Sequence, residues 1–274
     1  MPVSDFFISP ETLWDCIGYA GAPDIIDVRR REVFDASPGL VPASRWQDPG
    51  ADKQWIDACD PAKRAVIVCR QGHELSQSVA AELRARGIDA RVLAGGYAAW
   101  ERADLPLVAR KAYGRFITRV PSLWVTRRRP KIDRVACPWM IRRFIDPTAR
   151  FLFVDPPEVP AVARETGAIP FDIDGVELSH IGDRCSFDML LNLFGLDQDP
   201  ALAQLALIVR GADTAALNLA AEAAGLLAIS LGLSVLAGDD DHGLLRQGFV
   251  VYDALYAWRR KAASETHNWP ARAA

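Results

Sequence analysis

The sequence predicts two structural units, an α/β unit with a parallel sheet flanked by helices, followed by a mainly helical α+β unit. Short β-branched runs alternate with helical patterns in the first third of the chain, which is typical of a parallel sheet. The second half has few strand-like runs and several apolar helical patterns. A chain of 274 residues is long enough for two units that each bury a core.

Local patterns place the elements of the first unit. Ser9-Pro10-Glu11 joins an N-cap to a proline at the first helical position, so a helix should begin there. A second helical pattern covers residues 78–86 and stops before Gly87, the residue type that ends helices in a left-handed conformation. The expected strands are residues 25–29, 65–69 and 90–93.

We place the first unit at residues 1–109, a linker at residues 110–121 and the second unit at residues 122–274. The linker region is basic and irregular in pattern, and Pro121 directly precedes a new apolar run. The expected helices of the second unit are residues 137–145, 186–194, 200–212, 214–233 and 240–261, and its expected strands are residues 151–154 and 169–173.

Composition is typical of a soluble cytoplasmic protein. The net charge of −3 provides no general attraction for nucleic acid, and five scattered cysteines fit reduced thiols better than a disulfide framework. Residues 1–6 lack the pattern of a secretory signal. Residues 217–236 approach membrane-spanning length, but polar residues interrupt them, so we expect a buried helix and no membrane partner. Oligomeric state stays open.

Cys69 is the candidate nucleophile because it stands where an apolar run gives way to a helical pattern near Ser76. A tight loop there can direct backbone N–H groups at the sulfur, and the helix dipole adds positive potential that favours a thiolate. The alternative is an inert core cysteine. The candidate anion-binding loop is Arg70, Gln71, Gly72, His73, Glu74, Leu75 and Ser76.

Three phrases of the first unit resemble the rhodanese (sulfurtransferase) domain: Asp27-Val28-Arg29, residues 69–73 and residues 93–100. The resemblance covers about residues 5–108. It implies that Cys69 accepts sulfane sulfur from a small donor such as thiosulfate, holds it as a persulfide and passes it to a thiol acceptor. No cofactor is implied for that reaction.

The loop departs from the pattern of this family. An arginine usually precedes the closing serine or threonine, whereas here Glu74 and Leu75 precede Ser76 and the loop is one residue longer. A longer loop should form a wider cradle, suited to a larger oxyanion. Two interpretations follow: an active sulfurtransferase, or a non-enzymatic oxyanion or metal sensor that retains a degenerate rhodanese module.

The second unit resembles the C-terminal domain of ChrB-type chromate-resistance proteins over about residues 122–262. Residues 131–143 and 175–188 carry most of this resemblance, and residues 210–214 and 252–258 contribute to it. It implies a role in chromate resistance or in chromate-responsive regulation, with chromate as a candidate ligand.

Basic residues cluster between Arg127 and Arg143, which indicates either a solvated face or an anion-binding pocket. Chromate is a tetrahedral dianion, and arginines bind such ions through charge-assisted hydrogen bonds. The run is too short to favour nucleic acid. The residues assigned to the candidate pocket are Asp133, Arg134, Cys137, Arg142 and Cys185.

A metal site for zinc or iron is also considered in the second unit. Glu177 and His180 are three residues apart and would share one face of a helix, with Asp183 nearby. The alternative is a hydrogen-bonded histidine, with Asp183 or Asp188 capping the helix that begins at Ser186.

Overall fold

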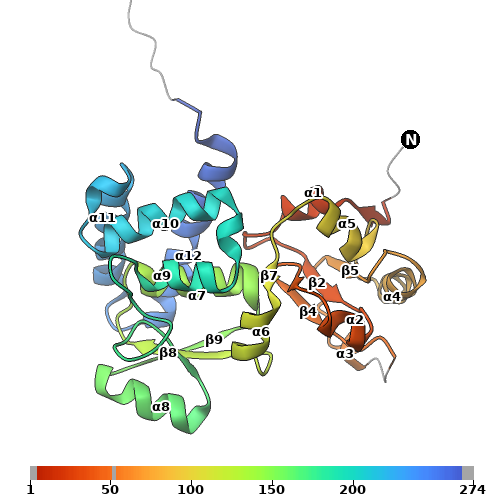
Figure 1. Ribbon diagram of the computed structural model, residues 1–274, viewed down its shortest axis with the longest axis horizontal. Helices are drawn as coiled ribbons and strands as arrows, with labels where there is room; N and C mark the ends of the chain where they lie inside the picture. The colour runs from red at the N-terminus through yellow and green to blue at the C-terminus, as the bar shows by residue number, and fades with distance from the viewer. Residues whose placement is uncertain (1–4, 51–53, 267–274) are drawn as a thin grey trace, which may run out of the picture.

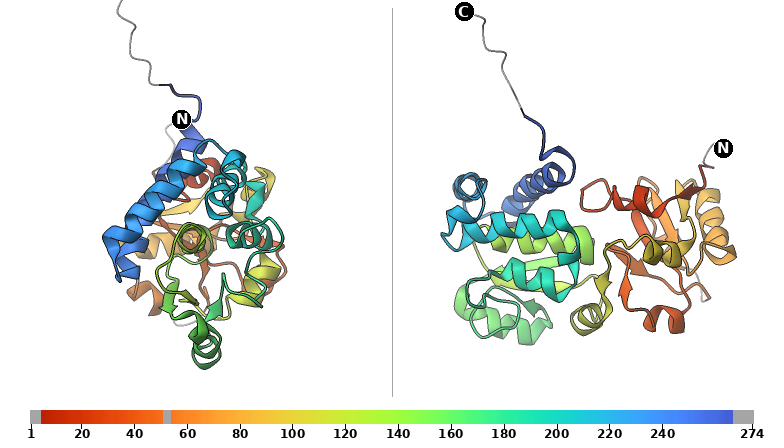
Figure 2. Two further views of the ribbon diagram at one scale, coloured as in Figure 1. Left: turned by 90° about the vertical axis from the view of Figure 1, so that its left-hand side faces the viewer. Right: turned by 45° about the horizontal axis from the view of Figure 1, so that its top comes forward.

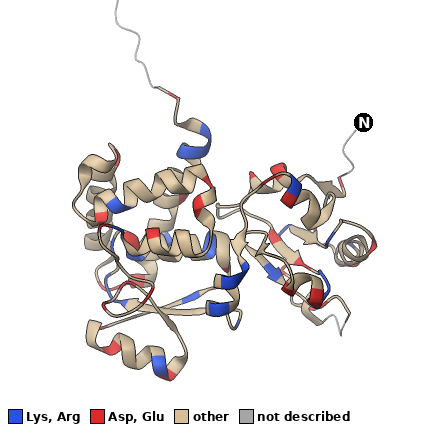
Figure 3. Ribbon diagram, viewed as in Figure 1, with Lys and Arg blue, Asp and Glu red and all other residues tan. Residues whose placement is uncertain are grey.

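The chain forms two lobes that lie side by side in the computed structural model, which describes residues 5–50 and 54–266 (Figures 1 and 2). Residues 1–4, on which the expectation about a secretory signal partly rests, lie outside the described residues. Among the residues described, none of the helices combines the length and the apolar character that a membrane crossing needs. Basic and acidic residues are interspersed over both lobes (Figure 3).

The N-terminal lobe is built on a five-stranded parallel sheet in the order β1-β6-β5-β2-β4. The predicted parallel sheet flanked by helices is therefore confirmed. β5 lies at the centre, and all four of its residues are buried. The strands are β1 (Phe7–Ile8), β2 (Asp24–Asp27), β4 (Ser44–Trp46), β5 (Ala65–Val68) and β6 (Ala90–Leu93).

Helices and a short antiparallel ribbon complete this lobe. The first helix begins where Ser9 predicts, since the Ser9 hydroxyl accepts the Thr12 N–H, but it ends at Trp14. The chain turns at Gly18, whose φ of +95° suits glycine. The elements are α1 (Pro10–Trp14), α2 (Arg31–Asp35), α3 (Gln54–Asp57), α4 (Glu74–Ala85), α5 (Gly96–Arg102), and the paired strands β3 (Gly39–Leu40) and β7 (Val108–Ala109).

The segment assigned as the linker contains a helix, α6 (Arg110–Phe116), which packs against the first lobe. The Arg110 guanidinium pairs with Asp35 and lies 4.1 Å from the centre of the Phe34 ring. These contacts hold the start of α6 in place.

The C-terminal lobe is mainly helical and contains a small parallel sheet in the order β10-β8-β9, which confirms the predicted class. Its strands are β8 (Leu123–Arg127), β9 (Arg150–Val154) and β10 (Ile169–Pro170). Its α-helices are α7 (Asp133–Met140), α8 (Val159–Thr166), α9 (Ser186–Leu193), α10 (Pro200–Asp213), α11 (Ala223–Ala237) and α12 (Asp241–Ala257). Single helical turns occupy Ile141–Ile145, Pro156–Glu158, Leu196–Gln198, Leu217–Leu219 and Trp258–Ala262.

One predicted helix and one predicted strand of this lobe were wrong in extent. The helix expected over residues 214–233 is interrupted, because Ala215 adopts a φ of +58° and only a short turn follows before α11. The strand expected over residues 169–173 pairs with β8 only through Ile169 and Pro170, after which the chain turns at Asp172.

The largest cluster of buried apolar side chains extends across both lobes, and each lobe also has a smaller cluster of its own. The ring of Trp14 contacts Trp100 in its own lobe and Phe144 in the other. Phe144 in turn packs edge-on against Tyr256. The lobes are therefore joined by apolar burial as well as by the connecting chain.

Candidate functional site

Cys69 directly follows β5, at the carboxyl edge of the parallel sheet, where such folds place their ligands. Its side chain is buried, and its Sγ lies 3.0 Å from the Oγ of Ser76 in the first turn of α4. The Ser76 hydroxyl also donates to the backbone oxygen of His73, over 3.0 Å. The thiol thus sits beside a hydroxyl group, at a junction between a strand and the N-terminal end of a helix.

The loop after Cys69 contains successive backbone N–H groups that can donate hydrogen bonds. Within the described residues, no acceptor receives a backbone N–H from residues 70–76. Seven successive peptide groups are therefore available to a bound anion, and the N-terminal end of the twelve-residue helix α4 adds positive potential.

Two glycines let the loop close against the chain that follows β6. Gly72 has a φ of +70°, and Gly96 has a φ of +61°. A Cβ added to Gly96 would lie 2.5 Å from the Gly72 nitrogen and 2.7 Å from the Gln71 nitrogen. The Tyr97 N–H donates to the Cys69 oxygen over 2.9 Å. The loop is thereby held in one conformation.

An open pocket of about 640 Å³ reaches Cys69. The predicted loop residues that line it are Arg70, Gln71, His73, Glu74 and Leu75. Four further residues also line it, namely Arg29, Arg30, Val33 and Gln77. Arg30 and Gln77 are site residues that sequence reasoning missed, since no local motif marks them.

The positive charges around this pocket are partly neutralised. Arg70 pairs with Glu101 over 2.7 Å, and Glu74 adds a negative charge to the lining. Arg29 is fully buried with Asp27, its Nη2 lying 2.7 Å from the carboxylate, and it stacks 3.8 Å from the centre of the Tyr97 ring. Burial raises the pKa of Asp27, and the hydrogen bonds from Arg29 oppose this rise. Of these pocket arginines, Arg30 alone forms no ion pair within the described residues.

The structure does not gather the anion-binding residues predicted for the second unit into one pocket. Cys137 and Cys185 are fully buried. Burial raises the pKa of each thiol, so neither resembles an activated nucleophile. Arg142 donates to the Ala149 oxygen over 2.9 Å and stacks on the Phe151 ring, away from the other candidates. Arg134 donates toward Asp172, with 3.1 Å between Nε and the carboxylate.

The predicted metal residues are also separated. The segment that contains Glu177 and His180 is not helical, so the expected shared face was wrong. Glu177 pairs with Arg115, and the Asp183 side chain is 90% exposed. His180 instead faces three carboxylates that the spacing did not indicate, and Asp188 rather than Asp183 caps α9.

Those three carboxylates come from separate parts of the chain and surround the His180 Nε2. The distances from Nε2 are 3.2 Å to Asp133, 3.2 Å to Asp213 and 3.3 Å to Asp172. Hydrogen bonding to Asp133 raises the pKa of His180 to about 9. Burial, together with the nearby Asp133 charge, raises the pKa of Asp213 to about 7. Local sequence patterns carry no signal for this cluster, because tertiary packing assembles it.

Comparison with protein families gives two adjoining matches. The model described as "ChrB, C-terminal domain" matches residues 124–259, and the model described as "Rhodanese-like domain" matches residues 9–103. The chain is 43% identical over 133 residues to Protein ChrB of Cupriavidus metallidurans. That match covers 48% of this chain and 39% of the relative, so the chain spans well under half of that protein's length.

Solved structures also match the N-terminal lobe. A rhodanese-like domain protein from Staphylococcus aureus is 26% identical, with a TM-score of 0.31, over 34% of this chain and 89% of the other. A rhodanese-related protein from Thermoplasma volcanium is 19% identical, with a TM-score of 0.33, over 37% of this chain and 95% of the other.

Proposed function

We propose that this chain, which contains a rhodanese-like domain at residues 9–103 and a ChrB C-terminal domain at residues 124–259, carries sulfane sulfur as a persulfide on Cys69. The observation that carries the proposal is the run of seven N–H groups from Arg70 to Ser76, which meet no acceptor in the described part of the chain and lie at the start of α4. Such a run stabilises an anion without requiring a charged side chain.

The reaction that fits this loop is transfer of sulfur between anions. The Cys69 thiolate attacks the outer sulfur of thiosulfate, the S–S bond of the donor breaks, and sulfite leaves with the bonding electron pair. The product is a cysteine persulfide anion. A thiolate acceptor then attacks the outer persulfide sulfur, takes it away and restores the Cys69 thiolate. Every species on the enzyme is an anion, which the loop N–H groups can stabilise.

The pocket is large enough to hold a small sulfur donor and a second molecule. Its volume of about 640 Å³ exceeds what one tetrahedral anion fills, and the loop is longer than the family pattern. The thiol acceptor can therefore approach through the same opening. Arg30 lies on this lining without an ion pair in the described part of the chain, and it would attract anionic donors.

The C-terminal lobe connects this chemistry with chromate. Its resemblance to ChrB-type proteins implies chromate resistance or sensing, and we propose that the protein serves such a system. The pocket at Cys69 is lined by residues 29–77 alone and the pocket beside His180 by residues 127–180, so the two sites are separate. We therefore propose no direct electron transfer between Cys69 and the buried thiols of the second lobe.

A second function, binding without catalysis, is favoured by one observation. Glu74 lines the Cys69 pocket, the arginine that usually precedes the closing serine is absent, and the charge of Glu74 opposes a dianionic donor. In that case the protein is an oxyanion sensor, and ligand binding stabilises the folded state. Chromate would then raise the melting temperature, whereas thiosulfate would leave the mass of the protein unchanged.

The test is turnover of thiosulfate in the presence of a thiol acceptor, followed by the release of sulfite. We expect wild-type protein and Cys16→Ser to release sulfite at the same rate and Cys69→Ser to release none. Cys16 is a matched control because its thiol lies outside the pocket lining. Equal rates in the wild type and Cys69→Ser would remove Cys69 from the reaction.

A further inference from the structure

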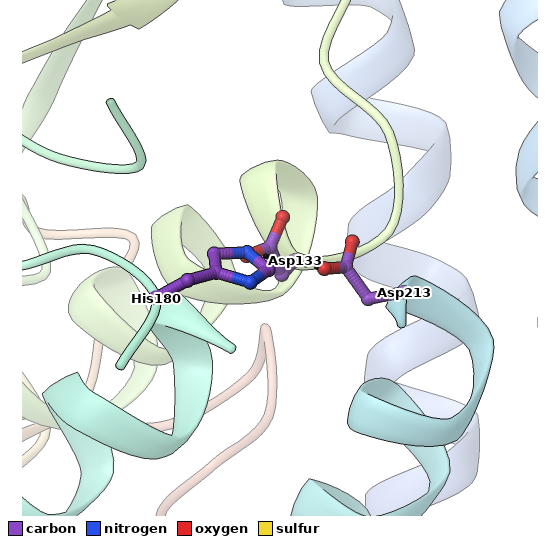
Figure 4. A group of neighbouring side chains, drawn as sticks. All are labelled: Asp133, His180 and Asp213. Atoms are coloured by element: carbon purple, nitrogen blue, oxygen red, sulfur yellow. Dashed lines mark hydrogen bonds and ion pairs between the residues drawn. The ribbon is translucent and has the colours of Figure 1, made fainter. Parts of the chain in front are cut away.

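The cluster around His180 draws one side chain from each of three distant segments. Asp133 begins α7, Asp213 ends α10, and His180 lies in the irregular stretch before α9. The three side chains point toward one another (Figure 4). One nitrogen or oxygen atom from each lies within 4.8 Å of the others, which is close enough for a single ion to contact all three.

The hydrogen bonds available in the cluster do not satisfy its carboxylates. His180 Nε2 has at most one hydrogen, yet three carboxylate oxygens lie within 3.3 Å of it. Asp172 has other donors, since Arg127 reaches it over 2.7 Å and the Ser186 hydroxyl over 2.9 Å. Asp133 and Asp213 pair with no lysine or arginine within the described residues.

A divalent cation would offset the two carboxylates that no arginine neutralises. Asp172 is offset by Arg127 and Arg134 and so needs no further positive charge. Asp133 and Asp213 have no lysine or arginine partner in the described part of the chain, and both face the His180 imidazole. Asp133 is almost fully buried, which makes an uncompensated charge there costly.

We propose that Asp133, His180 and Asp213 bind a divalent transition-metal ion. The ion takes the place of the hydrogen at His180 Nε2 and accepts one oxygen from each of the two aspartates. One imidazole with two carboxylates is a mixed nitrogen and oxygen set, which suits Zn²⁺, Fe²⁺ or Mn²⁺ rather than Ca²⁺ or a thiolate-bound metal. The neighbouring thiols, Cys137 and Cys185, take no part.

Two features around the cluster fit such a site. The ligand Asp133 accepts the Ser186 N–H over 3.3 Å, and the neighbouring Asp172 is fixed by Arg127, Arg134 and Ser186, which together form a rigid outer shell. A pocket of about 460 Å³ also borders His180 and Asp172. Because His180 is 40% exposed, this pocket gives an ion a path from solvent and leaves room for water on the metal.

The experiment measures Zn²⁺ bound by the full chain after treatment with a chelator, reloading and dialysis. A Cys69→Ser background removes the thiol of the N-terminal pocket as a competing ligand. We expect this protein to retain one Zn²⁺ per chain and to melt at a higher temperature with Zn²⁺. We expect His180→Ala and Asp213→Asn to weaken Zn²⁺ binding by more than about tenfold, as the loss of a metal ligand or its support does.

Matched controls come from the residues whose spacing suggested a metal site. Asp183→Asn and Glu177→Gln remove carboxylates that lie on the same segment but face elsewhere, so they should retain Zn²⁺ fully. The urea unfolding transition of His180→Ala, compared with that of its background, shows whether the fold is intact. Absence of Zn²⁺ binding, or equal binding by His180→Ala and its background, overturns the proposal.

Discussion

The Sγ of Cys69 lies 3.0 Å from the Oγ of Ser76, across the loop that joins β5 to α4. The Ser76 hydroxyl has one hydrogen and donates it to the His73 oxygen when the sulfur is a thiol. When the sulfur is a thiolate, the same hydroxyl can turn and donate to it. Ser76 therefore exchanges a neutral hydrogen bond for a charge-assisted one as Cys69 ionises.

Replacing this hydroxyl should slow the chemistry of Cys69. Hydrogen bonds to charged groups contribute roughly 1.5–3 kcal/mol, so Ser76→Ala should react with iodoacetamide roughly ten to a hundred times more slowly at neutral pH. Ser78→Ala is the matched control, because Ser78 is exposed on the same helix. Equal alkylation rates for the two variants would show that Ser76 does not assist the thiolate.

Gly96 should be required for the loop, because it lets the chain after β6 pass directly beneath the Cys69 loop. Gly96→Ala adds a methyl group 2.7 Å from the Gln71 nitrogen at a φ of +61°, and such backbone strain costs roughly 1–3 kcal/mol. We expect a lower melting temperature and a loss of sulfite release.

Gly87 provides the control for backbone strain alone. It has a φ of +82°, but a Cβ added there meets nothing within 4 Å. Gly87→Ala should lower stability by about 1 kcal/mol through the left-handed conformation and leave sulfite release unchanged. If both variants keep full activity, close packing beneath the loop has no part in the function.

The buried thiols should make the protein less stable in alkali. Burial raises the pKa of Cys137 well above its ordinary value in the folded state. Above about pH 8.5 the unfolded thiol loses its proton while the folded thiol keeps it, so the free energy of unfolding falls by up to about 1.4 kcal/mol per pH unit. Urea unfolding between pH 8 and 10 measures this slope.

A comparison of variants shows how much of the pH dependence of the free energy of unfolding comes from Cys137. Cys137→Ala should show a shallower fall than the wild type, whatever its stability at neutral pH, because one raised pKa has been removed. Cys16→Ala provides the comparison for the loss of a cysteine that is only partly buried. A slope unchanged by Cys137→Ala would contradict the assignment.

Arg260 should be important for holding the two lobes together. Its guanidinium donates to the Trp14 oxygen and to the Asp15 carboxylate, each over 3.1 Å, although it belongs to the helical turn Trp258–Ala262 of the other lobe. Its side chain is 9% exposed. Arg260→Ala should lower the free energy of unfolding by roughly 1.5–3 kcal/mol, measured by urea unfolding.

Arg246, an exposed arginine, provides the control for Arg260→Ala. Arg246 is 71% exposed and lies 3.5 Å from Asp240, so Arg246→Ala should change stability by less than about 0.5 kcal/mol. Similar decreases in the free energy of unfolding for both variants would show that the hydrogen bonds of Arg260 across the lobes do not stabilise the protein.

Local sequence patterns predicted the position of Cys69 between a strand and a helix, but they did not predict which residues surround His180. The position of Cys69 depends on a strand and a helix that are adjacent in sequence, and both leave clear periodic signals. The His180 cluster depends on segments 33 to 47 residues away, since its partners are Asp133 and Asp213. Spacing within one segment pointed to Glu177, but that segment is irregular, and only packing reveals the partners.

A persulfide on Cys69 can be detected by the intact mass of the protein after treatment with thiosulfate and removal of the excess. We expect the wild-type protein to gain the mass of one sulfur atom, a reducing thiol to remove it, and Cys69→Ser to gain nothing. Peptide mapping should place the sulfur on Cys69. No gain of mass in the wild type, or an equal gain in Cys69→Ser, would contradict the proposal that Cys69 carries a persulfide.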